Sequence, residues 1–114
     1  MRKIITFCLV LIGLNTQAQT QLFIPDTLVG PSYTLNMHKD SVQFFPLGNK
    51  SKTFAYNLNK YLGPTLIFNK GANVNITVNN LIGDTTTVHW HGIHLPSKWD
   101  GGPHTPILPS ATWN

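Results

Sequence analysis

The stretch Asn73-Val74-Asn75-Ile76-Thr77-Val78-Asn79 alternates strictly between polar and apolar side chains. Successive side chains of a β-strand point to opposite faces of a sheet, so a period of two is typical of a strand with one buried face. Val74, Ile76 and Val78 are predicted to face a core, and the polar side chains between them to face outward. This segment is the clearest strand in the chain and indicates a β fold.

Shorter extended segments lie on both sides of this strand. Residues 33–37 alternate in the same way, and the apolar parity changes afterwards at Val42 and Phe44, which predicts a bulge or bend near residues 40–41. The other predicted strands are residues 52–56, 64–68 and 85–91, and the turns between strands are predicted at residues 46–50, 69–71 and 80–84. Short strands separated by such turns predict an all-β sandwich or barrel.

The first residues have the features of a secretory signal peptide. Arg2 and Lys3 precede an apolar run at residues 4–14, which is shorter than the roughly 20 residues of a membrane span. A small residue, Ala18, follows at a position suited to cleavage. We therefore expect a signal peptide at residues 1–18 and a periplasmic or secreted product with no membrane contact after cleavage.

The segment that remains after cleavage is small and weakly charged. Removing 18 residues from 114 leaves 96, with six lysines, four aspartates and no cysteine, because Cys8 lies in the signal peptide. Charged residues at 11% and hydrophobic residues at 41% exclude a charge-rich disordered chain and a multi-pass membrane protein. The lysines are scattered, so no basic patch for nucleic acid is expected. Residues 19–32 are predicted to form an N-terminal arm with one extended piece at residues 22–24.

Two histidines two residues apart are the strongest chemical feature. On a strand, His89 and His91 would project to one face with their Cα atoms about 6.5–7 Å apart, and Trp90 would point the opposite way into packing. Neutral imidazoles are good ligands for copper and zinc. The pair could bind one metal ion or serve two adjacent ions, and exposed strand histidines without a metal are the alternative.

The other histidines are less well placed for metal binding. His94 has the wrong parity to join the pair, and His104 lies in a predicted loop. Both are expected to be solvated or to touch a ligand rather than the metal. His38 is expected to be exposed on the polar face of an early strand.

The residues around the histidine pair resemble the start of a multicopper oxidase. Thr86-Thr87-Val88-His89-Trp90-His91-Gly92 is similar to the first copper motif of that family, H-W-H-G. The resemblance also includes Gly63-Pro64-Thr65-Leu66-Ile67-Phe68, the turn at Gly71, the strand at residues 74–81, Asp100-Gly101-Gly102-Pro103-His104 and Ile107-Leu108-Pro109. It covers residues 33–114, and the ordered combination is far more specific than the histidine pair alone.

The resemblance implies a fold and a chemistry. Multicopper oxidases such as laccases and bilirubin oxidases are built from cupredoxin domains, so residues 33–114 would form a partial first cupredoxin (plastocyanin-like) domain, an incomplete all-β Greek-key sandwich. In that family a type 1 copper takes electrons from a reducing substrate, and a cluster of one type 2 and two type 3 coppers reduces dioxygen to water. By resemblance His89 would be a type 2 ligand and His91 a type 3 ligand, and Asp100 would orient neighbouring groups and help to deliver protons.

The sequence also departs from the family pattern. Ala72 replaces an acidic residue and Ser110 a glycine, and the second copper motif, W-Y-H-x-H, and the type 1 cysteine are absent from these 114 residues. We therefore interpret the chain as the copper-binding N-terminal part of an exported multicopper oxidase, inactive by itself. In such a truncated domain, strands such as residues 73–79 are expected to have unpaired edges.

Two other functions are weighed against this interpretation. A small stand-alone periplasmic copper-binding module without catalysis would need a closed fold in 96 residues, and no closing strands are predicted after Gly92. A purely structural secreted β-domain leaves the His-Trp-His-Gly match unexplained. An in-frame W-Y-H-x-H coding sequence downstream of Asn114 would favour the oxidase.

Overall fold

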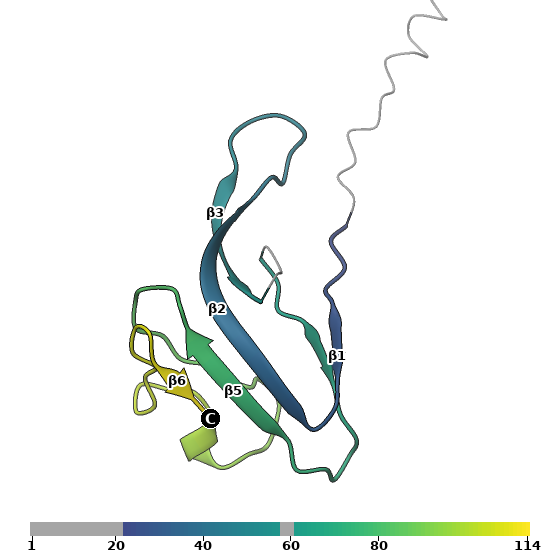
Figure 1. Cartoon of the computed structure of the whole chain (residues 1–114), viewed down its shortest axis with the longest axis vertical. Helices are drawn as coiled ribbons and strands as arrows, with labels where there is room; N and C mark the ends of the chain where they lie inside the picture. Colours follow the sequence, from purple (N-terminus) through teal and green to yellow (C-terminus); the bar gives the residue numbers. More distant parts are fainter. Residues whose placement is uncertain (1–21, 58–60) are drawn as a thin grey trace, which may run out of the picture.

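The computed structural model describes residues 22–57 and 61–114, and the predicted signal peptide lies outside these residues. The described part is all-β apart from one short 3₁₀ helix, as predicted. Its elements are β1 (Thr27–Val29), β2 (Ser32–Val42), β3 (Ser51–Tyr56), β4 (Thr65–Ile67), β5 (Asn75–Asn80), η1 (Ser97–Trp99) and β6 (Thr112–Trp113). Four strands form a sheet in the order β3-β2-β5-β6, and β1 pairs with β4 (Figure 1).

The core lies where β2 and β5 run parallel, in a register that places Leu35 opposite Val78. Leu35, Met37 and Val78 are buried there together with Val88 and Ile107 from the later loops. The predicted strand is confirmed at Asn75–Asn80, with Val78 in the core and Ile76 packed against it, whereas Val74 precedes the strand and is half-buried. The expectation of unpaired edges for this segment is wrong only in part: β5 lies between β2 and β6, but β6 pairs with Val78 and Asn79 alone, so within the described residues Asn75–Thr77 have a ladder partner only on the β2 side.

The ladder between β2 and β3 shows why the apolar parity changes along β2. Six successive residue pairs run without interruption from Met37↔Tyr56 to Val42↔Ser51, so the predicted bulge at residues 40–41 is wrong. The predicted alternative, a bend, is what Figure 1 shows, since β2 is strongly curved. Beyond Met37 the strand pairs only with β3, and two-stranded ribbons twist more than wide sheets. The twist carries Val42 back into a buried position.

Three segments differ from the expected elements. The predicted strand at residues 85–91 makes only one isolated bridge, Thr86↔Ile107, because the backbone groups that follow bind loop residues. The extended piece expected at residues 22–24 is not a strand, and β1 forms slightly later, where β4 supplies a parallel partner. The short strand β6 lies after Gly92, where no closing strand was predicted.

The two small strands pack close to the main sheet. Leu66 of β4 contacts the core cluster, and the Tyr33 hydroxyl of β2 donates a hydrogen bond to the carbonyl of Ile67 at 2.5 Å. No helix within residues 22–57 and 61–114 is long and apolar enough to cross a membrane.

Candidate metal centre

The histidine pair lies on a segment whose side chains alternate between the core and solvent. Val88 is buried in the core cluster, and Trp90 packs against the same cluster. His89 and His91 are exposed, and their ring centroids are 5.6 Å apart. The segment is thus extended enough to place both imidazoles on one face, as predicted, although it is not a strand of either sheet.

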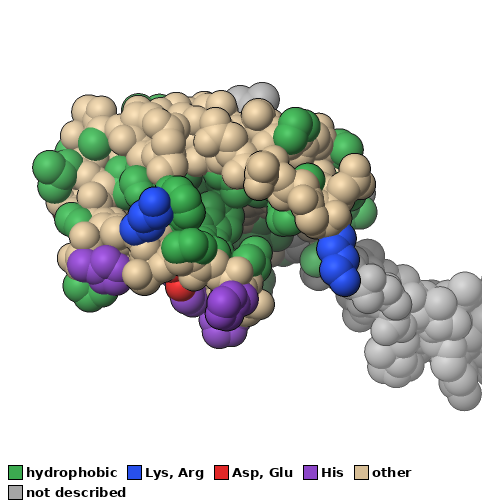
Figure 2. Space-filling model, turned by 90° about the horizontal axis from the view of Figure 1, so that it is seen from below, with side chains coloured by type: hydrophobic (Ala, Val, Ile, Leu, Met, Phe, Trp, Pro, Cys, Tyr) green, Lys and Arg blue, Asp and Glu red, His purple; other side chains and the backbone are tan. Residues whose placement is uncertain are grey.

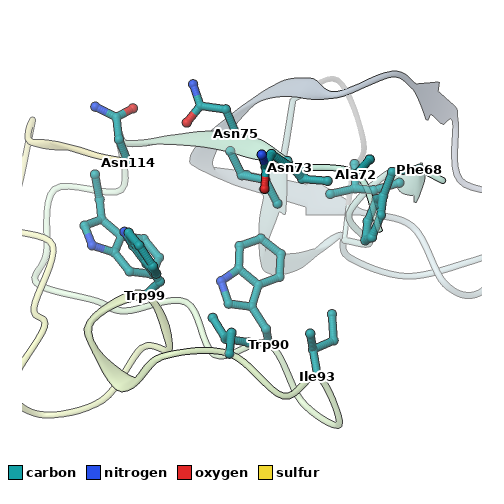
Figure 3. A pocket seen from close by; sticks show the side chains of 13 residues that line it. Phe68, Ala72, Asn73, Asn75, Trp90, Ile93, Trp99 and Asn114 are labelled. Carbon is teal, nitrogen blue, oxygen red and sulfur yellow. The ribbon is translucent and has the colours of Figure 1, made fainter. Parts of the chain in front are cut away.

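Trp90 fixes which way this segment faces. Its side chain projects toward a hollow of about 730 Å³ between β5 and the loop after the histidines (Figure 3). The hollow is lined mainly by apolar side chains, which include Leu66, Phe68, Ile76, Trp99 and Trp113. The half-buried indole lies on this side, so the two imidazoles project from the other side. Figure 2 shows histidine side chains along the edge of a face that is hollowed in its middle.

Gly92 ends the extended segment directly after the second histidine. Its φ of 79° lies in the left-handed region, which glycine adopts without steric cost. The amide of Ile93 then donates to the carbonyl of Trp90 at 3.0 Å, which closes the turn. The turn carries His94 away on an exposed loop.

Asp100 lies against the first histidine of the pair. Its Oδ1 accepts hydrogen bonds from Nδ1 of His89 at 2.7 Å and from the backbone N–H of Trp90 at 3.1 Å. The hydrogen bond from the Trp90 N–H lowers the pKa of the Asp100 carboxyl most. Desolvation is the next-largest effect and opposes it, and the hydrogen bond and charge of His89 and the charge of His104 each lower the pKa by less. Asp100 is therefore held as a carboxylate facing His89.

Gly101 allows the carboxylate to come this close. Its N–H donates to the carbonyl of Val88 at 2.8 Å, so the two backbones touch beside the histidine. A Cβ at this position would lie 2.1 Å from the carbonyl oxygen of Val88 and 2.4 Å from Oγ1 of Thr87. Only a residue without a side chain fits between these groups.

The remaining histidines do not join the pair. Nε2 of His104 lies 3.3 Å from the carbonyl of Ser97, and the ring is exposed beside Gly102. His38 lies on β2, 3.8 Å from Asp40, and its side chain is 29% exposed, so it is less exposed than predicted. Within the described residues no group of three or more His, Cys, Asp or Glu side chains could hold a metal ion.

Sequence reasoning found the pair and Asp100 but missed the residues that bring them together. Gly101 was noticed only as part of a Gly-Gly-Pro stretch, and Asn80 only as part of a turn. A glycine directly after a candidate carboxylate is the signal that could have suggested a close backbone approach. Nothing in the sequence indicates the pairing of Thr86 with Ile107.

Comparison with known proteins identifies the family of the chain. The family model described as multicopper oxidase matches residues 38–114. The chain is 46% identical over 78 residues to the multicopper oxidase mco of Staphylococcus aureus, a match that covers 68% of this chain and 17% of the relative. It is 29% identical over 89 residues to copper resistance protein A of Escherichia coli, which covers 78% of this chain and 14% of the relative.

Solved structures show the same likeness. A laccase-like multicopper oxidase, CueO, from an Ochrobactrum species superimposes with a TM-score of 0.75 at 30% identity, covering 82% of this chain and 21% of that one. A laccase from Pediococcus acidilactici superimposes with a TM-score of 0.70 at 32% identity, covering 83% and 22%. The chain spans roughly a sixth of the length of the curated relatives it matches best in sequence. It belongs to the multicopper oxidase family, with the all-β cupredoxin-like fold and the copper cofactors that the family implies.

Proposed function

We propose that this chain is the copper-binding N-terminal part of an exported multicopper oxidase, with residues 33–114 as a partial first cupredoxin domain. His89 would supply a type 2 ligand and His91 a type 3 ligand. The partners would be copper ions, dioxygen and a reducing substrate. The family membership supports the copper chemistry, and the geometry around His89 supports the choice of residues.

One observation carries the proposal. The carboxylate of Asp100 can only accept a hydrogen bond, so Nδ1 of His89 carries the proton in the 2.7 Å contact. Nε2 of the neutral ring is then the unprotonated nitrogen, with its lone pair available to a metal. A carboxylate on the other ring nitrogen is one of the ways in which proteins orient a metal-binding histidine.

The residues present fit copper in part. Two exposed imidazoles with ring centroids 5.6 Å apart are nitrogen donors of the kind that copper prefers. Two donors do not enclose a metal ion, and the described residues provide no third within the same group. We infer that the other copper ligands come from residues outside the described part of this chain. The relative from Staphylococcus aureus, of which the match covers 17%, is long enough to provide such residues.

Copper, when bound, would pass electrons from the reducing substrate to dioxygen, which takes up four electrons and four protons to become two water molecules. The residues of this chain have narrower tasks. His89 and His91 hold their rings on one face, and Asp100 fixes the ring of His89. The lowered pKa of Asp100 favours this orienting role, while proton delivery would require the carboxylate to take up and release protons from solvent.

Calorimetric titration with Cu²⁺ tests the proposal. The wild-type chain should bind Cu²⁺ weakly and more tightly than Zn²⁺, because Cu²⁺ stands above Zn²⁺ in the affinity order for nitrogen sites. A His89→Ala/His91→Ala double variant should lose this binding. The matched control is His38→Ala, which removes an imidazole on β2 and should bind as wild type does. Equal affinity of the double variant and the wild type would refute the choice of ligands.

A further inference from the structure

Asn80, the last residue of β5, is a polar side chain in the core with no exposed surface. Its amide nitrogen donates to the carbonyls of Asp84 at 2.7 Å, Ile107 at 2.8 Å and Leu108 at 3.1 Å. Its amide oxygen accepts from the N–H of Ile82 at 3.1 Å. A buried amide is tolerated only when it is hydrogen-bonded in this way, and the proposed copper chemistry makes no direct use of it.

The contacts of Asn80 lead to the segment that carries the histidines. The carbonyl of Ile107 accepts from the Asn80 side chain and also from the N–H of Thr86, and the N–H of Ile107 donates back to Thr86. The chain then runs from Thr86 to His89 on one side and from Ile107 back to Asp100 on the other. The amide of Asn80 is therefore at the point where these two segments are first joined.

Further contacts continue the alignment as far as the metal centre. Oγ1 of Thr87 donates to the carbonyl of Thr105 at 3.2 Å, and the N–H of Gly101 donates to the carbonyl of Val88 at 2.8 Å. The last contact in this series is the one between Asp100 and His89. A shift of residues 107–108 relative to residue 86 would be transmitted to that contact, because the bonds between share the same two backbones.

We propose that Asn80 is a positioning residue for the His89–Asp100 pair. Its two N–H groups, directed at three carbonyl oxygens, hold residues 107–108 and the turn after β5 in one arrangement, and this arrangement sets the distance between Asp100 and His89. The part of this inference that concerns copper rests on the proposed function, whereas the part that concerns the two side chains does not.

Holding residues 107–108 in place requires an amide at position 80. An aspartate has nearly the same shape, but its oxygens would face the carbonyl oxygens of Asp84, Ile107 and Leu108 with no proton between them. The repulsion would push residues 107–108 away from β5. The neighbouring Asn79 offers a matched control, because it lies on the same strand and its side chain bonds Asn36 and Thr112 instead of residues 107–108.

The test compares Asn80→Asp and Asn79→Asp in the full chain labelled with ¹⁵N-histidine. In alkaline solution, nitrogen–proton correlation spectra report which nitrogen of His89 carries the proton. Wild type and Asn79→Asp should show the proton on Nδ1, and Asn80→Asp should lose this preference. Cu²⁺ affinity should fall roughly 10–100-fold in Asn80→Asp only, as for loss of a group that orients a ligand.

A folded Asn80→Asp chain that keeps the proton of His89 on Nδ1 would overturn the inference. If Asn80→Asp does not fold, hydrogen exchange of the wild-type chain decides. The amides of Ile82 and Gly101 should then exchange with equal protection, as members of one cooperative unit, and faster exchange of Gly101 would overturn the inference. If Asn80→Asp loses the form of His89 protonated on Nδ1 while the wild-type chain binds no copper, the proposed function is refuted and this inference is supported.

Discussion

Replacing Gly101 by alanine is the sharpest single perturbation of the metal centre. The added Cβ would lie 2.1 Å from the carbonyl oxygen of Val88, whereas real Cβ contacts essentially never fall below 3.0 Å. One of the two backbones must therefore move by at least about 0.9 Å. If Asp100 moves with its neighbour and away from His89, their 2.7 Å contact lengthens to about 3.6 Å, which is too long for a hydrogen bond.

The energetic consequence follows from the same clash. Overfilling a well-packed position costs about 1–3 kcal/mol, and the atoms in the way here are backbone atoms that cannot rotate aside. Urea unfolding should give a free energy lower by this amount in Gly101→Ala. The ¹⁵N spectrum of His89 should lose the form protonated on Nδ1, because the Asp100 carboxylate no longer reaches the ring.

Gly102→Ala is the matched control at the next position. Its Cβ would meet Cε1 of His104 at 3.0 Å and Nδ1 at 3.2 Å, and both atoms belong to an exposed ring that can turn away. This variant should stay within about 0.5 kcal/mol of wild type, as substitutions away from packed features usually do. Gly101→Ala and Gly102→Ala with equal stability and unchanged His89 spectra would refute the argument that a close backbone approach builds the site.

The remaining predictions address charge, activity and export. The pKa of Asp100 is lowered from its ordinary value of 3.8, so the carboxylate stabilises the fold above that value, and this contribution is lost as the pH falls through the lowered pKa. Urea unfolding as a function of pH should therefore show a smaller loss of unfolding free energy in this acid range for Asp100→Asn than for wild type. Asp100→Asn should also bind Cu²⁺ roughly 10–100-fold more weakly, by calorimetry. Oxygen uptake with a phenolic donor and Cu²⁺ should show no turnover by the 114-residue chain, because it offers only the two proposed ligands His89 and His91 and its single cysteine, Cys8, lies in the predicted signal peptide. Turnover that is lost in His91→Ala would contradict this. N-terminal sequencing of the exported product should begin at Gln19, and an intact Met1 on that product would contradict the predicted cleavage.

Local patterns were sufficient where one residue type decides the structure. The alternation around Val78 predicted a strand with a buried face, and the spacing of His89 and His91 predicted two imidazoles on one side. The turn at Gly71 was predicted by residue type, and its φ of 83° requires such a residue. These features depend on neighbours in sequence, which is why the sequence alone reveals them.

Features that depend on distant partners were missed. β1 forms at Thr27–Val29 because β4 lies beside it, and the segment around His89 is not a strand because only Thr86 finds a partner. The apolar parity of β2 predicted a bulge or a bend without deciding between them, and the uninterrupted ladder with β3 excludes the bulge. In each case the pairing of segments far apart in sequence, which no local pattern encodes, decides the outcome.

The same division applies to the candidate site. Asp100 was assigned by resemblance to orient neighbouring groups and to help to deliver protons; it lies in contact with His89, and proton delivery stays a prediction. Gly101 lies against the backbone of residue 88, and the Asn80 side chain bonds the backbone of residues 107–108. A glycine and an asparagine have no residue-type signal for such contacts, so the sequence does not predict them.

Pulsed electron paramagnetic resonance of the chain with less than one equivalent of Cu²⁺ tests the central claim most directly, because it detects imidazole nitrogens bound to copper. Wild type and a His94→Ala/His104→Ala variant should show the same imidazole couplings, and these couplings should disappear in His89→Ala/His91→Ala. Couplings that persist in His89→Ala/His91→Ala and disappear in His94→Ala/His104→Ala would contradict the assignment of His89 and His91 as the copper ligands of this chain.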